Sequence, residues 1–201
     1  MPDTPQIYLV TPARLDLSTF GDRMAAVMDT VEIACARLST AGMDADAVMR
    51  SGDHLRQICH ARDVALVVET HTPMVGQLGL DGVHLPPGGS VREARKVLGK
   101  DGIVGAACGT SRHAGLNAGE AGADYVAFGP MTPDPRLGEE AAEVDLFRWW
   151  SEMIEVPCVA EGGLNRTLVE ALSPVADFLA VGDEIWAEDD PAGALKRLLG
   201  S

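Results

Sequence analysis

The sequence predicts a single-domain (β/α)₈ barrel over residues 1–201, and three observations support this fold class. Short apolar runs alternate with amphipathic segments about eight times, the number of βα repeats that closes such a barrel. The runs are continuous rather than alternating, as expected of parallel strands buried on both faces. Glycine-rich turns follow the last two runs, where barrels bind phosphate, whereas an open doubly wound sheet normally has such glycines after its first strand.

The first half of the chain predicts four strands, at 7–10, 31–38, 65–68 and 82–85. Helices are expected around 24–28, over 45–61 and over 91–98. Ser90 and Glu93 are spaced as a capping box, which predicts the start of the last of these helices.

The second half predicts strands at 103–108, 124–129, 156–160 and 176–181. Helices are expected over 112–121, 144–155 and 192–199, and after Asn165, which is a typical helix N-cap. Leu146, Trp150 and Met153 are spaced as one apolar stripe of the helix over 144–155. Residues 129–143 show no period and form either a lid over the barrel mouth or a plain surface loop.

Composition excludes several classes of partner. The formal charge of −14 argues against nucleic acid and anionic membranes, because both bind to clustered cations. No apolar run approaches the roughly 18 residues of a spanning helix, and the start MPDTPQIYLVTP is unlike a signal peptide. We therefore expect a cytoplasmic protein. Its four cysteines form no C-x-x-C pair, which favours buried free thiols.

The two glycine-rich turns contain a conflict of charge. Backbone N–H groups in such turns favour a phosphate. Glu161, however, precedes Gly162 and Gly163, and Asp183 and Glu184 follow Gly182. Carboxylates beside a phosphate oppose its binding unless they point away or are neutralised. Glu161 and Asp183 form either an acid/base pair or a cation site. Alternatively, they belong to a site that is no longer under functional demand.

Four segments resemble the thiamine phosphate synthase family and its tautomerase relatives: DGVHL (81–85), GEAGADYVAFGP (119–130), VPCVAEGG (156–163) and ADFLAV (176–181). The resemblance runs from QIYLVTP to the last strand. It implies a barrel enzyme of thiamine biosynthesis that joins a hydroxymethylpyrimidine pyrophosphate to a thiazole phosphate, with Mg²⁺ on the pyrophosphate and release of PPi. It implies small-molecule substrates, and a homodimer is one option for assembly.

Carried over residue by residue, the resemblance implies a degenerate active site. Of the family's cations after the second strand only Arg37 remains, and the positions of the Mg²⁺ ligands read Thr70 and Gly89. A hard cation needs oxygen ligands, so we expect no metal site. Gly109 stands where the tautomerases transfer a proton. The implied substrate-binding residues are Arg37, Glu69, Cys108, Thr132, Arg136, Gly162, Gly163 and Gly182, and the candidates for catalysis are His71, Glu161 and Asp183.

Three functions remain open. The first is a thiamine phosphate synthase whose activity is weak or lost because metal and phosphate ligands are replaced. The second is a non-catalytic or divergent barrel that binds a thiazole, a pyrimidine or a cationic small molecule. The third is a tautomerase-like enzyme. Arg37 either holds a phosphate or pairs with Glu69 or Glu161, and His84 is expected to be a structural histidine.

Overall fold

The computed structural model describes residues 4–200 and contains one closed barrel of eight parallel strands in chain order. Each strand pairs with its neighbour in sequence, and β1 pairs with β8 to close the barrel. The predicted fold class is therefore confirmed. The strands are β1 (Gln6–Val10), β2 (Ile33–Leu38), β3 (Ala65–Glu69), β4 (Gly82–Leu85), β5 (Ile103–Ala107), β6 (Tyr125–Phe128), β7 (Cys158–Glu161) and β8 (Phe178–Val181).

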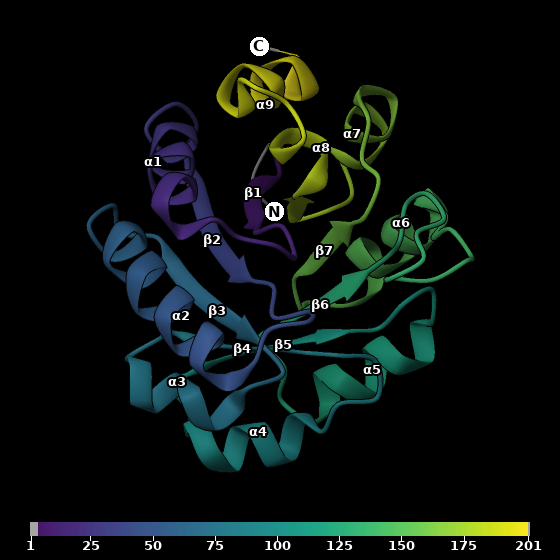
Figure 1. Ribbon diagram of the computed structural model, residues 1–201. Helices are drawn as coiled ribbons and strands as arrows, with labels where there is room; N and C mark the ends of the chain where they lie inside the picture. The colour runs from purple at the N-terminus through teal and green to yellow at the C-terminus, as the bar shows by residue number, and fades with distance from the viewer. Residues whose placement is uncertain (1–3, 201) are drawn as a thin grey trace.

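The helices form a ring outside the strands (Figure 1). Two predicted starts are confirmed, since Ser90 accepts a hydrogen bond from the Glu93 amide and Asn165 accepts one from the Leu168 amide. None of the helices in the described part of the chain is long and apolar enough to cross a membrane. The helices are α1 (Leu17–Met28), α2 (Ala45–His60), α3 (Thr72–Leu78), α4 (Val91–Leu98), α5 (Arg112–Glu120), α6 (Val144–Met153), α7 (Arg166–Leu172), α8 (Asp183–Trp186) and α9 (Pro191–Leu199).

Three details differ from the sequence-based expectations. Helices α3 and α8 were not expected, because they are short and each buries only two side chains. The apolar stripe predicted for α6 is wrong at Met153, which is 63% exposed. Phe147 is fully buried beside Leu146 and Trp150 instead, so this helix packs on the barrel through its first two turns.

The inside of the barrel is polar where apolar branched side chains are usual. Tyr8, Arg37, His84, Tyr125 and Glu161 are all buried there, each from a different strand. The apolar side chains buried with the tyrosines in this interior are those of Cys35, Val67, Ala127, Val159 and Ala180. The larger apolar core lies between the strands and the surrounding helices.

The ring of Tyr125 occupies space that only a glycine leaves free. A Cβ atom added to Gly105 on β5 would overlap the ring of Tyr125 at Cζ. Tyr125 is held at its hydroxyl by hydrogen bonds to Tyr8 and His84, so it has little freedom to move away.

We predict that Gly105→Ala lowers the free energy of unfolding by about 1 to 3 kcal/mol or more through overpacking. Gly76→Ala is the control, because a Cβ at this position in α3 meets nothing within 4 Å. That change should raise stability by about 0.5 to 1 kcal/mol, since alanine favours helix. Urea unfolding of both variants is the measurement, and equal effects would contradict the packing of the barrel interior.

Candidate functional site

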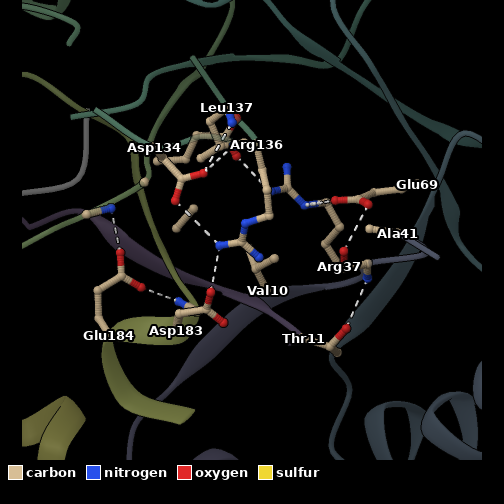
Figure 2. Close-up of a pocket in the computed structure, with 16 residues that line it drawn as sticks. Val10, Thr11, Arg37, Ala41, Glu69, Asp134, Arg136, Leu137, Asp183 and Glu184 are labelled. Atoms are coloured by element: carbon tan, nitrogen blue, oxygen red, sulfur yellow. Dashed lines mark hydrogen bonds and ion pairs between the residues drawn. The ribbon is translucent and has the colours of Figure 1, made fainter. Parts of the chain in front are cut away.

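A pocket of about 330 Å³ lies at the carboxyl end of the strands. Its walls come from the ends of β1, β2, β3, β7 and β8, and from the loop that follows β6. Figure 2 shows Asp134, Asp183 and Glu184 on one side of this pocket, and Arg37 and Glu69 on the other. The carboxyl end is the face on which barrel enzymes carry their active sites.

The lining of the pocket is acidic. It contains two guanidinium groups, Arg37 and Arg136, and five carboxylates. Both arginines are already paired with carboxylates, so neither is free to attract an anion without exchanging a partner. The carboxylates are those of Glu69, Asp134, Glu161, Asp183 and Glu184.

Arg37 extends from β2 into the barrel and is only 4% exposed. Its Nη2 donates a hydrogen bond of 2.7 Å to Oε2 of Glu161, the last residue of β7. Its Nε lies 3.3 Å from Oε1 of Glu69 at the end of β3, outside hydrogen-bonding geometry. Of the two interpretations of Arg37, ion pairing inside the barrel mouth is therefore the one that the structure contains.

A chain of buried hydrogen bonds continues from Arg37 across the barrel. Nη1 of Arg37 lies 2.7 Å from Nε2 of His84, and Nδ1 of His84 lies 2.9 Å from the Tyr125 hydroxyl. The Tyr125 hydroxyl lies 2.7 Å from that of Tyr8. A guanidinium only donates, so Nε2 of His84 accepts and its proton is on Nδ1. His84 is thus a structural histidine, as expected.

Burial and charge set the protonation of this chain. Burial and then the positive charge of Arg37 hold the pKa of His84 well below its usual value, which keeps the imidazole neutral. Burial lowers the pKa of Arg37, but the negative charges of Glu161 and Glu69 more than offset it and keep the guanidinium charged. Burial also raises the pKa of the Tyr8 and Tyr125 hydroxyls, so both remain protonated.

The second arginine of the pocket, Arg136, lies on the loop after β6 and is half exposed. Its Nη2 donates to Asp183 at 2.6 Å and lies 3.5 Å from Asp134. Asp134 also caps this loop, since its Oδ1 accepts from the Arg136 amide at 2.7 Å. The loop is fixed to itself by an antiparallel bridge between Asp134 and Gly138. Its motion as a lid remains a prediction.

The carboxylate of Glu184 accepts hydrogen bonds from backbone N–H groups of both glycine turns. Its Oε1 accepts from the amides of Gly163 (2.8 Å) and Leu164 (3.0 Å), and its Oε2 accepts from the amide of Gly182 (2.7 Å). Gly162 and Gly163 have φ of +84° and +73°, a conformation in which side chains are strained.

The charge conflict predicted from the sequence is resolved by neutralisation. Glu161 pairs with Arg37, and Asp183 pairs with Arg136. The carboxylate that meets the amides is Glu184, which the sequence places with Asp183 after Gly182 but which was not among the predicted site residues.

Most of the predicted site residues meet in this pocket, but three do not line it. His71 stands at the N-cap position of α3 without a side-chain capping hydrogen bond, and its Nδ1 lies 2.9 Å from the Glu69 carbonyl oxygen. Cys108 lies in a separate pocket between β5 and α5, and burial raises its pKa to about 12, so it is an unreactive thiol. Thr132 donates to the Gly163 carbonyl oxygen at 3.4 Å. The residues that do line the pocket are Arg37, Glu69, Arg136, Glu161, Gly162, Gly163, Gly182 and Asp183.

The residues present do not fit Mg²⁺. Thr70 and Gly89 stand at the two positions expected to supply carboxylates. Glu69, which is adjacent to Thr70, accepts hydrogen bonds at Oε2 from the Ser39 hydroxyl and the Thr40 amide. Among residues 4–200, no three His, Cys, Asp or Glu side chains are grouped as metal ligands. The carboxylates of the described pocket thus pair with arginines or N–H groups, and they do not converge as the oxygen ligands that a hard cation needs.

We predict that Glu161→Leu lowers the free energy of unfolding by about 3 to 5 kcal/mol, because it removes the close partner of a buried charge. Asp183→Ala removes the partner of the half-exposed Arg136 and should cost no more than about 1 kcal/mol. Urea unfolding followed by tryptophan fluorescence compares the two variants. Equal losses would show that Arg37 does not depend on Glu161 for its burial.

The comparisons with known proteins agree on one family. The family model of thiamine monophosphate synthase matches residues 7–185. A relative from Rhodospirillum centenum, "Thiamine-phosphate synthase", is 39% identical over 94% of this chain and 91% of its own. Another of the same name from Erythrobacter litoralis is 38% identical over 93% of this chain and 91% of its own.

Solved structures show the same fold at lower identity. The thiamine phosphate pyrophosphorylase from Pyrococcus furiosus superposes with a TM-score of 0.82 at 21% identity, over 97% of this chain and 95% of its own. The 3-hexulose-6-phosphate synthase from Salmonella typhimurium has a TM-score of 0.73 at 16% identity, over 96% of this chain and 97% of its own. The sequence matches show a family relationship in addition to the shared fold. The chain belongs to the thiamine monophosphate synthase family.

Proposed function

We propose that this chain acts in thiamine biosynthesis as a weak thiamine phosphate synthase, which joins a hydroxymethylpyrimidine pyrophosphate to a thiazole phosphate and releases pyrophosphate. The family match over residues 7–185 carries the proposal, because it extends from the first strand to the last. The relatives that are 39% and 38% identical carry the name of this activity and align over more than nine-tenths of their own length.

The pocket at the carboxyl end is the place for this reaction. Its volume of about 330 Å³ lies within the range of small-molecule sites, about 300 to 1,000 Å³. Arg136 is the cation best placed to bind the pyrophosphate, because its half-exposed guanidinium can exchange Asp183 for a ligand oxygen. Arg37 is buried and held by Glu161, so its role is to fix the floor of the pocket.

The same geometry supports a weak activity. The backbone N–H groups suited to the thiazole phosphate already bind Glu184. The positions expected to hold Mg²⁺ carry no carboxylate. Each lost hydrogen bond to a charged group costs about 1.5 to 3 kcal/mol, and about 1.4 kcal/mol is a factor of ten in rate.

A second candidate function is a binding protein for a cationic small molecule, such as a thiazolium. It is favoured by one observation, the excess of five carboxylates over two arginines in the lining of the pocket. Opposite charge attracts such a ligand, and no chemistry is required of the site. A tautomerase has less support, since Gly109 provides no side chain at the proton-transfer position and His71 does not line the pocket.

We predict slow formation of thiamine phosphate when the purified protein is incubated with both substrates. Arg136→Ala should lower this rate at least about tenfold, the effect of losing one hydrogen bond to a charged ligand. Arg148→Ala is the matched control, because it removes an equally exposed arginine that pairs with Asp145 on α6. Chromatography of the product is the measurement.

Two results would contradict the proposal. Equal rates in the Arg136→Ala variant and the parent would place the reaction away from this pocket. The second candidate would be established instead by two results together. The protein forms product no faster than the mixture without protein, and calorimetry shows that it binds a thiazolium cation.

A further inference from the structure

We propose that Glu184 determines specificity in this pocket by acting as a built-in anion, so that the chain accepts a thiazole alcohol in preference to the thiazole phosphate. The inference rests on the proposed function in one respect, the choice of a thiazole as the ligand. The carboxylate and the N–H groups that it occupies are described by the structure independently of any reaction.

Glu184 accepts three hydrogen bonds from these backbone N–H groups. Three donors from two separate turns, Gly163, Leu164 and Gly182, converge on its two carboxylate oxygens at 2.7 to 3.0 Å. All three line the pocket or directly adjoin its wall. Hydrogen bonds of this kind to an ionised acceptor are roughly twice as strong as neutral ones.

A phosphate group must displace Glu184 to reach the same donors. The carboxylate is part of the chain, so it competes as an intramolecular ligand, and tethered groups reach effective concentrations of about millimolar or more. If Glu184 stays in place, its charge repels the phosphate instead. The neighbouring acids do not add to this barrier in the same way, because Glu161 and Asp183 are paired with arginines.

An alcohol can bind without displacing Glu184. A carboxylate offers about four acceptor sites on its two oxygens. Three of them are used by the backbone N–H groups, two on Oε1 and one on Oε2. The remaining site on Oε2 can accept a hydrogen bond from a hydroxyl group. With Glu184 on these N–H groups, the pocket favours a neutral hydroxyl beside the carboxylate over a phosphate that must displace it.

The test is to measure the affinity of inorganic phosphate, thiazole phosphate and thiazole alcohol by calorimetry for the parent protein and Glu184→Ala. We expect the parent to bind the alcohol at least as tightly as the phosphate ester. In Glu184→Ala this order should reverse, and inorganic phosphate should bind at least tenfold more tightly than to the parent. Glu188→Ala is the control, because it removes the same charge from an exposed residue outside the pocket lining and should behave as the parent.

A second variant and a second measurement guard against loss of folding. Glu184→Gln keeps the size of the side chain and removes only its charge, and it should also gain phosphate affinity. Phosphate should raise the melting temperature of both Glu184 variants and not that of the parent, because a ligand stabilises only a native state that binds it. Equal phosphate binding by parent and variants would overturn the inference. If phosphate affinity rises but neither thiazole compound binds, Glu184 is the internal anion and the proposed function fails.

Discussion

The charge of Arg37 inside the barrel is the constraint on which this structure depends. A guanidinium that is 4% exposed needs partners, because an isolated buried charge costs several kcal/mol. Glu161 supplies the close carboxylate and His84 the neutral acceptor, while Tyr125 and Tyr8 complete the chain of hydrogen bonds. Four strands, β1, β4, β6 and β7, are thereby tied to β2 through their side chains. The floor of the pocket is fixed by the same contacts.

Carboxylates of the chain bind the cations of the pocket and the N–H groups of its glycine turns. Arg37, Arg136 and the backbone N–H groups of both glycine turns are bound by carboxylates of the chain. The scaffold of the thiamine monophosphate synthase family is thus kept, and its anion-binding groups are filled from within. This arrangement explains how a chain with glycine turns suited to phosphate can have an acidic mouth without leaving charges unpaired.

The sequence predicted the barrel because continuous apolar runs and helix caps such as Ser90 and Asn165 are local signals. It also placed Glu69, Glu161 and Asp183 at strand ends, since parallel strands of a barrel end on one face. The sequence did not predict which carboxylate binds which donor in the pocket. Glu184 could not be separated from Asp183 on spacing, because the four-residue helix α8 decides which of the two carboxylates turns toward the glycines.

The central claim is that the chain's own carboxylates fill the anion-binding groups of the pocket. A crystal structure of the protein grown in concentrated phosphate tests it most directly. The account predicts that Glu184 remains on the N–H groups of Gly163, Leu164 and Gly182, and that Arg37 remains paired with Glu161. Phosphate density on those three amides, with Glu184 turned away, would contradict it.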